Sequence, residues 1–434
     1  MPTTLKAFNL SDPKLALNGG TPVRSKKWAD NLTFGQEEQE AAAKAVAAGY
    51  LSMFEGSFTP DPPMSFRGGP LVQRLEDEWA AFYGVKHAVS MNSATSCLSA
   101  AVGALGLGYG DEVIVSPSTM SASSVVPLVY GAIPIFADIE RSTGSIDPAS
   151  VEKLITPRTK GIIVVHQFGI PADMDRIMAL ARKHGIKVIE DCAQSHAAKY
   201  KGRSVGTIGD IGVFSLNVNK AIHCGEGGIC TVNDDELTYR LQLIRNHAEA
   251  VAGPAGVKDI TNLIGFNFRM TEVHAAVALE QMKRLEHINT VRIGYVEWLN
   301  EQAARFDFLE TMPGRADCVS TFYTYPIIYK DEVGGVSVDD FRKALNAEGM
   351  YWLAGYKPLY YQPIYQTKTA FKDGMPWSAP ANRAIKTNYA PGSCPVAERM
   401  RAQVMIKEYA RLPNTMEDMR DIVKAFEKLA GTRR

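Results

Sequence analysis

Three segments of this chain place polar side chains directly after short apolar runs. Residues 92–96 (NSATS) follow one such run and open a helical pattern, and residues 188–194 (VIEDCAQ) end another run in two adjacent carboxylates. In residues 214–228 (FSLNVNKAIHCGEGG), the single lysine Lys220 precedes a glycine-rich stretch that lets the backbone approach a ligand closely. Because ligands bind beyond the carboxyl ends of strands in open α/β sheets, the three segments are candidates for one site.

Each segment offers a different chemical group. Small and hydroxyl side chains at a helix N-terminus leave free N–H groups that suit a phosphate, although Ser and Thr also cap ordinary helices. The acids Glu190 and Asp191 can hold a protonated ring nitrogen, bind a metal or act as a base, or they can be ordinary loop acids. A lysine amine partly removed from water is a usable nucleophile, whereas most lysines lie on the surface.

The order of the three groups is more specific than any one of them. A phosphate-type turn comes first, the strand-end Asp191 second and Lys220 third. Pyridoxal phosphate needs an anion site for its phosphate, a carboxylate on its ring nitrogen and an amine for a Schiff base. The sequence therefore predicts pyridoxal 5'-phosphate as the cofactor.

The elements that position these groups alternate along residues 71 to about 232. Apolar runs predict strands, and helix-favouring stretches predict helices between them. Such alternation is typical of βαβ units and of a largely parallel sheet covered on both faces. The expected strands are residues 88–91, 112–115, 160–165, 187–190, 211–214 and 229–232, and the expected helices are residues 36–48, 71–83, 95–107 and 172–184.

A long helical stretch, residues 271 to about 306, leads into a C-terminal part with weaker alternation. We interpret that part as a smaller α+β domain. The predicted division is residues 1–290 for a large cofactor-binding domain with an N-terminal arm and residues 291–434 for the small domain.

Composition limits the class of protein. The 434 residues carry 47 Lys and Arg against 47 Asp and Glu, so the basic excess of a nucleic-acid-binding protein is missing. Six cysteines without a Cys-x-x-Cys pair do not suit a disulfide framework, and the His and Cys spacing matches no common zinc pattern, so we expect no metal. The dilute cysteines suit a reducing, cytoplasmic setting, and the N-terminus lacks the apolar core of a signal peptide.

Residues 113–137 carry no charge and are numerous enough to cross a bilayer. However, Pro117, Pro127 and Pro134 interrupt the stretch, and three serines cluster at positions 121, 123 and 124. We expect strand, turn, buried helix and strand here, and no membrane association.

The chain resembles the DegT/StrS family of pyridoxal-phosphate-dependent sugar aminotransferases from about residue 33 to its C-terminal region. The segments that carry the resemblance are GDEVIVSP (110–117), IEDCAQSHAA (189–198), GTIGDIGVFS (206–215), Lys220 with GEGG (225–228), and IGFNFRMTEVHAA (264–276). The resemblance implies an α/β fold of the aspartate aminotransferase type (fold type I). It also implies amino transfer from L-glutamate or L-glutamine to the ketone of a nucleotide-linked keto-sugar or a keto-cyclitol.

By position, the resemblance assigns roles around the cofactor ring. Lys220 carries the Schiff base and shuttles the proton, Asp191 pairs with the pyridine nitrogen, and Gln194 contacts the ring-oxygen side. The phosphate is bound by Ala94, Thr95 and Ser215, and by Asn267 from the neighbouring subunit. That last role implies a homodimer with shared active sites.

The sequence leaves the family pattern at two places. Ser118-Thr119-Met120 puts a methionine where the family has an aromatic residue stacked on the pyridine ring, so Met120 is the candidate for that contact. Tyr356-Lys357-Pro358-Leu359 lacks the histidines usual near that motif, which leaves substrate recognition open. His166, after a buried strand, is interpreted as a structural histidine.

Two other functions fit the same resemblance. One is a pyridoxal-phosphate-dependent deoxysugar dehydratase, but those relatives carry His in place of the Schiff-base lysine, so Lys220 argues against it. The other is a non-catalytic regulatory homologue, which has no chemical need for Lys220, Asp191 and Ser215 together.

Overall fold

A seven-stranded sheet forms the centre of the larger lobe in this computed structural model, which describes residues 7–56 and 65–434. Every neighbouring pair is parallel except the two pairs made by β9, which runs against both its neighbours. The predicted, mostly parallel α/β sheet is therefore confirmed. In spatial order the strands are β1 (His87–Met91), β9 (Gly228–Val232), β8 (Ile211–Ser215), β5 (Lys187–Asp191), β4 (Thr159–Val165), β2 (Glu112–Val115) and β3 (Ile133–Phe136).

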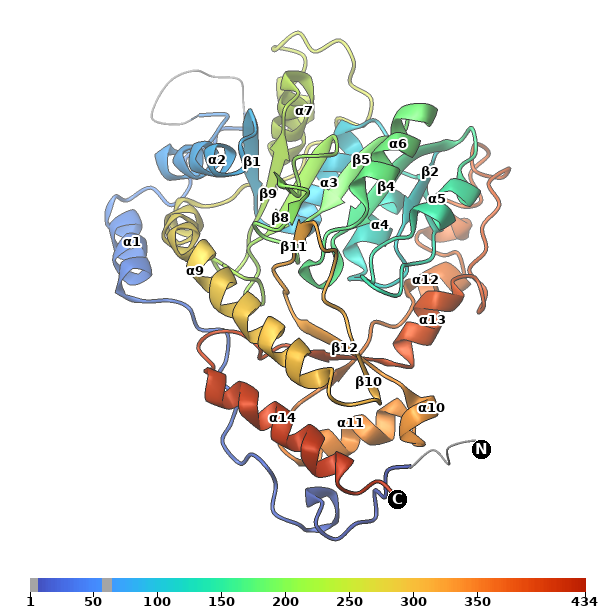
Figure 1. Cartoon of the computed structure of the whole chain (residues 1–434). Helices are drawn as coiled ribbons and strands as arrows, with labels where there is room; N and C mark the ends of the chain where they lie inside the picture. Colours follow the sequence, from blue (N-terminus) through green and yellow to red (C-terminus); the bar gives the residue numbers. More distant parts are fainter. Residues whose placement is uncertain (1–6, 57–64) are drawn as a thin grey trace.

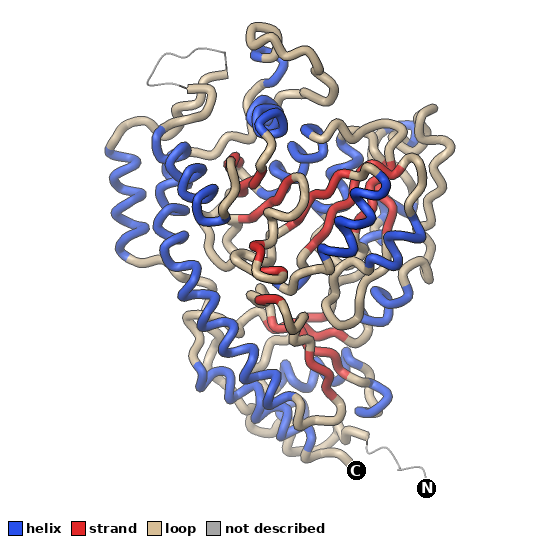
Figure 2. The backbone as a smooth tube through the Cα atoms, turned by 45° about the horizontal axis from the view of Figure 1, so that its top comes forward, coloured by secondary structure: helices blue, strands red, loops and turns tan. Residues whose placement is uncertain are grey.

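Helices cover both faces of this sheet, as Figures 1 and 2 show. Successive strand residues point to opposite faces, so Val113 and Val115 join one apolar core and Ile114 joins the other. The first core includes α3 (Ala94–Ala104), α4 (Ala122–Val129) and α7 (Asp235–Arg245). The second includes α2 (Pro70–Tyr83), α5 (Pro148–Leu154), α6 (Met174–His184) and the first half of α9 (Glu272–Ala303).

A smaller lobe follows α9, which continues without a break through residue 290. Its antiparallel sheet has the order β10 (Leu309–Thr311), β12 (Tyr325–Tyr329), β14 (Val404–Lys407) and β13 (Leu353–Ala354). Two helices pack beside this sheet, α11 (Val338–Ala347) and α14 (Met416–Ala430). The division at residue 290 stays a prediction.

The N-terminal segment lies along the smaller lobe (Figure 1). The Phe8 backbone N–H donates to the Gly334 carbonyl, and Arg24 forms an ion pair with Asp418 of α14. Residues 23–33, which run from this lobe toward the larger one, are called the N-terminal strap below.

Shorter elements complete the described chain. A three-stranded sheet joins β11 (Cys318–Val319), β6 (Lys199–Tyr200) and β7 (Arg203–Ser204). The remaining helices are η1 (Ala16–Asn18), α1 (Gln36–Ala47), η2 (Gln167–Gly169), α8 (Ala248–Val251), α10 (Asp331–Gly334), η3 (Leu359–Tyr361), α12 (Pro363–Gln366), η4 (Lys372–Gly374) and α13 (Pro395–Arg401).

The expected elements are present, with ends that coincide or shift by at most three residues. α6 begins at Met174 rather than at residue 172 because the Asp173 side chain caps its N-terminus. α3 ends at Ala104 rather than at residue 107 because Gly106 takes a φ of 72°, which ends the helix. Residues 113–137 form β2, α4 and β3, as expected from their prolines.

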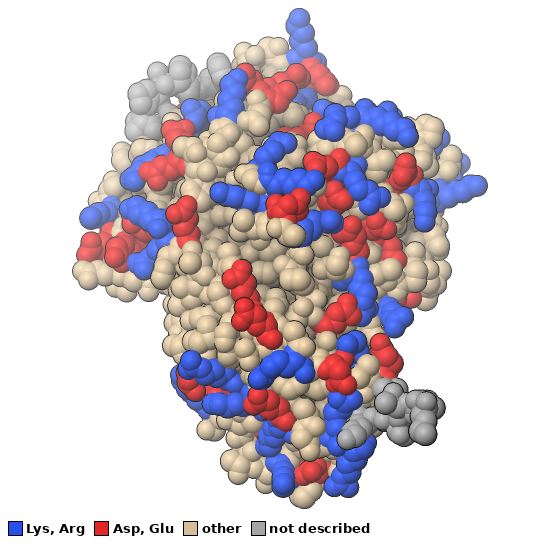
Figure 3. Space-filling view, viewed as in Figure 1, with Lys and Arg blue, Asp and Glu red and all other residues tan. Residues whose placement is uncertain are grey.

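The six cysteines are all free thiols. Within the described ranges, none of the helices combines the length and apolar character needed to cross a membrane. On the face drawn in Figure 3, Lys and Arg side chains are interspersed with Asp and Glu, which agrees with the zero formal net charge.

Candidate active site

A cavity of about 310 Å³ lies at the carboxyl ends of β5 and β8, within the usual range of ligand pockets. It brings together all three polar segments that the sequence singled out. The predicted site residues that line it are Ala94, Thr95, Met120, Asp191, Gln194, Ser215 and Lys220. Asn267 is not among the lining residues.

The phosphate-type turn is the first turn of α3. Backbone N–H groups in a first helical turn have no intrahelical acceptor, so those of Ala94 and Thr95 remain available at the cavity. The Ser93 hydroxyl caps the helix by accepting from the Ser96 N–H at 3.1 Å. Gly228 of β9 permits this placement, because a Cβ there would lie 2.5 Å from the backbone N of Ala94. Ser215, the last residue of β8, lines the same cavity.

Asp191 is the last residue of β5 and is almost fully buried. Its carboxylate is fixed by two donors: the Ser123 hydroxyl bonds Oδ2 at 2.7 Å, and the Ala193 N–H bonds Oδ1 at 3.1 Å. Hydrogen bonding and burial together hold this carboxylate in one orientation, which is a requirement for recognising a single ring atom.

Lys220 is the last residue of a turn that begins at Asn217. Its backbone N–H donates to the Asn217 carbonyl at 2.9 Å. Its Nζ lies over the ring of Tyr323, 4.5 Å from the centroid. This cation–π contact orients the amine at the cavity, which Tyr323 also lines. Tyr356 also lines the cavity. It is the first residue of the segment 356–359, which differs from the family pattern.

Gln194 lies beside the cavity with both ends of its amide bound. The Phe168 N–H donates to Oε1 at 2.8 Å, and Nε2 donates to Gln167 Oε1 at 3.4 Å. Phe168 has a φ of 60°, so the backbone here is held in the left-handed region. The side chain of Gln194 is therefore preorganised rather than free to rotate.

Glu190, which precedes Asp191 in β5, forms a fully buried pair with His166, 3.0 Å apart. The Ala172 N–H donates to His166 Nδ1 at 3.0 Å, so Nε2 carries the proton that Glu190 accepts. Burial opposes the ionisation of Glu190, but the bonds from His166 and the Gly206 and Gly209 N–H groups lower its pKa overall. Both ring nitrogens of His166 thus have partners in the buried interior, which agrees with its interpretation as a structural histidine.

Cys192 completes a cluster with His166 and Glu190 whose potential ligand atoms lie within 4.8 Å of one another. Burial raises the pKa of the Cys192 thiol, and the charges of Glu190 and Asp191 raise it further. Because the histidine and the carboxylate already have hydrogen-bond partners and the thiol is protonated, the donor set does not suit a metal ion.

His196 lies near Lys220 and packs edge-on against Trp79 and Phe214, with ring centroids 6.2 and 5.7 Å away. Burial, together with the positive charge of Lys220, lowers the pKa of His196 to about 3. The ring is therefore neutral at physiological pH and does not compete with Lys220 for a proton.

Three predicted site residues are exposed: Thr95, Met120 and Asn267. Met120 lines the cavity with 62% of its surface accessible, so a face of its side chain is open to a ligand. Asn267 is exposed at an isolated bridge with Asn246, and its Oδ1 accepts from Arg269 Nε at 2.8 Å.

Sequence reasoning did not identify Ser123, Tyr323 or Asn219 as site residues. Ser123 belongs to the serine cluster in the uncharged stretch, which is the signal that could have identified it. Tyr323 has no such signal, because it lies in the smaller lobe, about a hundred residues from Lys220 along the chain.

The family model of the DegT/DnrJ/EryC1/StrS aminotransferase family matches residues 64–407 of this chain. Among solved structures, an aminotransferase from Psychrobacter cryohalolentis superposes with a TM-score of 0.77 and 28% identity, over 94% of this chain and 98% of its own. The fold of this chain is thus that of an aminotransferase.

Two curated proteins are similar to this chain over most of its length. The L-glutamine:2-deoxy-scyllo-inosose aminotransferase of Streptomyces kanamyceticus is 31% identical over 97% of this chain and 97% of its own length. The GDP-perosamine synthase of Caulobacter vibrioides is 35% identical, over 68% of this chain and 79% of its own length.

Proposed function

Because this chain belongs to the DegT/DnrJ/EryC1/StrS aminotransferase family, we propose that it uses pyridoxal 5'-phosphate to transfer an amino group to a keto-cyclitol. The amino donor is L-glutamine or L-glutamate. A nucleotide-linked keto-sugar is the second candidate acceptor, and the GDP-perosamine synthase relative favours it.

One observation carries the proposal: the first turn of α3, the Asp191 carboxylate and the Lys220 amine line a single cavity. These are the anion site, the ring-nitrogen partner and the covalent anchor that pyridoxal phosphate needs. Ser215 and Thr95 add hydroxyl groups at the phosphate end. The same set argues against a regulatory homologue, and Lys220 argues against a dehydratase that has His in its place.

When bound, the cofactor supplies an electron sink for charge that develops on the donor's α-carbon. The chain's own residues do the rest. Asp191, held by Ser123, keeps the ring nitrogen protonated. Lys220 would anchor the cofactor, and its amine would move a proton at the reacting carbon. Without a ligand, the Lys220 Nζ lies over the Tyr323 ring at the cavity.

The cavity lining supports an uncharged polyol as acceptor. Asn217, Asn219 and Thr119 offer amide and hydroxyl groups that suit substrate hydroxyls, and Asn217 Nδ2 is bound to Glu226 Oε1 at 2.9 Å. Among the lining residues of the described chain, Lys220 is the single Lys or Arg. A diphosphate on a nucleotide-linked sugar calls for further cations, so the keto-cyclitol is the first candidate.

The proposed active unit is a homodimer. Asn267 lies outside the cavity of its own chain, with its side chain exposed, and reaches the phosphate of the partner's cofactor. The Asn267 and Arg269 pair is then a surface that the partner covers.

A donor and acceptor screen tests the proposal. The protein, loaded with pyridoxal phosphate, is mixed with L-glutamine or L-glutamate, and loss of the visible cofactor band reports amino transfer. Free inososes and nucleotide-linked keto-sugars are then added in turn, and recovery of the band identifies the acceptor. Recovery with a nucleotide-linked sugar alone would replace the first candidate by the second. No loss of the band with any amino donor would contradict an aminotransferase.

A further inference from the structure

The backbone around Lys220 is held by two side chains from distant parts of the chain. Asn31 Nδ2 donates to the carbonyl oxygens of Val218 and Lys220, each at 2.9 Å. Arg411 Nη1 donates to the carbonyl oxygen of Asn219, which lies between them, at 3.2 Å. Three consecutive carbonyls of one turn are thus bound by side-chain donors.

Arg411 is buried, yet within the described part of the chain it forms no ion pair at 4.0 Å or less. Its Nε is also buried without a hydrogen-bond partner. Burying a guanidinium that lacks a carboxylate partner is costly. A gain in fold stability therefore does not explain its place, whereas a bond to the turn that carries Lys220 gives it a functional reason.

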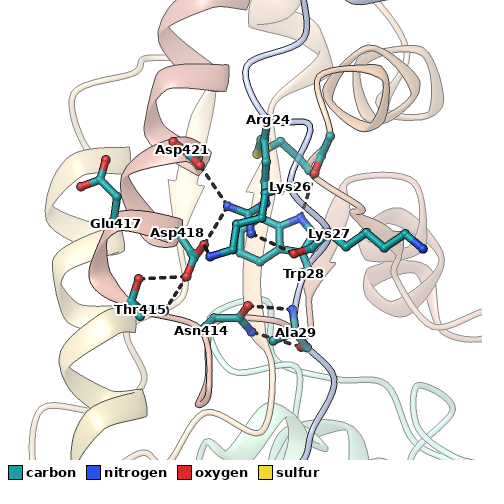
Figure 4. A network of polar contacts seen from close by, with 12 residues as sticks. Arg24, Lys26, Lys27, Trp28, Ala29, Asn414, Thr415, Glu417, Asp418 and Asp421 are labelled. Carbon is teal, nitrogen blue, oxygen red and sulfur yellow. Dashed lines mark hydrogen bonds and ion pairs between the residues drawn. The ribbon is translucent and has the colours of Figure 1, made fainter.

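Asn31 belongs to the N-terminal strap, which is anchored on the smaller lobe just before it. Asn414 Oδ1 accepts from the Ala29 N–H at 3.0 Å, and Asn414 Nδ2 donates to the Ala29 carbonyl at 3.3 Å. Figure 4 shows this two-way contact, in which one amide side chain binds the strap as a neighbouring strand would.

Charged and aromatic groups fix the preceding residues of the strap (Figure 4). Arg24 Nη1 forms ion pairs with Asp418 at 2.8 Å and Asp421 at 3.0 Å, both on α14. The Arg24 guanidinium lies 4.1 Å and the buried Lys407 Nζ of β14 lies 3.7 Å from the Trp28 ring centroid. The strap is therefore a rigid support at the point where Asn31 leaves it.

Beyond Asn31 the strap is held by the larger lobe. His223 Nε2 bonds the Asn31 carbonyl at 3.3 Å, and Thr33 Oγ1 donates to Gln281 Oε1 of α9 at 3.0 Å. Asn31 is thus fixed on both sides before it binds the turn. Its amide position is determined by the packing of both lobes.

We propose that Asn31 and Arg411 are positioning residues for Lys220. By orienting the carbonyls of residues 218–220, they set the direction in which the Lys220 side chain enters the cavity. Small misplacements of a reacting group have large effects on rate, so such a clamp has a catalytic consequence without touching the substrate. This inference rests on the proposed role of Lys220.

The test compares two buried asparagines whose Nδ2 atoms each donate to two backbone carbonyls. Asn382 Nδ2 also donates to two carbonyls, of Gly131 and Pro376, each at 2.8 Å, and it does not line the cavity. Asn31→Asp and Asn382→Asp each replace a donor by an oxygen that faces two carbonyl oxygens. Both changes thus place a carboxylate against two carbonyl oxygens, whereas the Asn31 change alone lies at the Lys220 turn.

Both variants and the wild type are loaded with pyridoxal phosphate. The readouts are the visible circular dichroism of the bound cofactor and the single-turnover rate of band loss with saturating L-glutamine or L-glutamate. Asn31→Asp is expected to alter the dichroism and to slow the rate by about 10-fold to 100-fold at full cofactor occupancy. Asn382→Asp retains the wild-type dichroism and rate.

Equal dichroism and equal rates in the two variants would overturn the positioning role. Arg411→Met removes the donor to the Asn219 carbonyl and is expected to slow the rate in the same way. If Asn31→Asp fails to fold, Arg411→Met takes its place in the comparison. A wild-type protein that shows no donor-dependent loss of its band would instead contradict the proposed function, and the inference with it.

Discussion

Ser123, in the first turn of α4, donates a buried hydrogen bond of 2.7 Å to Asp191, the last residue of β5. The bond joins two segments that are 68 residues apart in the chain. Because the Ala193 N–H binds the other carboxylate oxygen, Ser123 sets the plane in which the Asp191 carboxylate faces the cavity.

We expect Ser123→Ala to weaken pyridoxal phosphate binding roughly tenfold, the scale of one hydrogen bond to a charged group. The reason is that the carboxylate loses the donor that orients it toward the ring nitrogen. Ser124→Ala is the control, since Ser124 is equally buried and bonds Tyr365 at 2.7 Å instead. Titration of the two apo variants with the cofactor measures the affinities, and equal affinities would refute a role for Ser123.

Met120 is expected to contact one face of the cofactor ring. A thioether against an aromatic ring contributes roughly 0.3–1.5 kcal/mol, and a stacked aromatic side chain contributes a similar roughly 0.5–1.5 kcal/mol. Met120→Tyr is therefore expected to bind the cofactor about as well as the wild type, and Met120→Ala more weakly, with a shifted visible band. An unchanged affinity and spectrum in Met120→Ala would show that another residue makes the contact.

The lowered pKa of the buried His196 leads us to predict that the folded protein loses stability in mild acid. In the unfolded chain an imidazole takes up a proton near pH 6.5, whereas the folded protein keeps His196 neutral down to about pH 3. Between these pH values the unfolded state binds more protons, so the free energy of unfolding falls as the pH falls. The contribution is at most about 1.4 kcal/mol per pH unit.

His196→Phe removes this titration while keeping a ring against Trp79 and Phe214. Urea unfolding of both proteins between about pH 6.5 and pH 4.5 measures the effect. We expect the wild type to lose stability more steeply than the variant across this window. Parallel pH dependences would contradict a buried, neutral His196.

The groups on β5 and β8 could be predicted from the sequence because each follows an apolar strand. Asp191 and Ser215 are the last residues of those strands, and parallel strands end at one edge of the sheet. The N-terminus of α3 was equally accessible to prediction, since small and hydroxyl residues precede a helical pattern. Periodicity was sufficient to place these segments, whereas the phosphate-binding roles of Ala94, Thr95 and Ser215 came from the family resemblance.

Tyr323, Asn31 and Arg411 could not be predicted in the same way. They lie in the strap and in loops of the smaller lobe, where no period marks a residue that faces the cavity. Their positions depend on how the two lobes pack, through contacts such as Arg24 with Asp418. Only the folded chain brings them to Lys220.

From the exposed position of Asn267, we predict that each active site contains residues of both subunits. Lys220→Ala and Asn267→Asp are each expected to be inactive, the second because its negative charge repels the cofactor phosphate. Mixed and exchanged, they are expected to recover activity, since a heterodimer has one site with both groups intact and one with neither. Heterodimers that form but remain inactive would place Asn267 outside the site.

The most direct test of the account is the identity of the lysine that binds the cofactor. The protein loaded with pyridoxal phosphate is treated with borohydride, and its peptides are analysed by mass spectrometry. We predict that the reduced cofactor is attached to Lys220, and that Lys220→Ala still binds the cofactor but has no visible band of the wild-type kind and no turnover. Attachment to another lysine, or full activity in Lys220→Ala, would contradict the assignment.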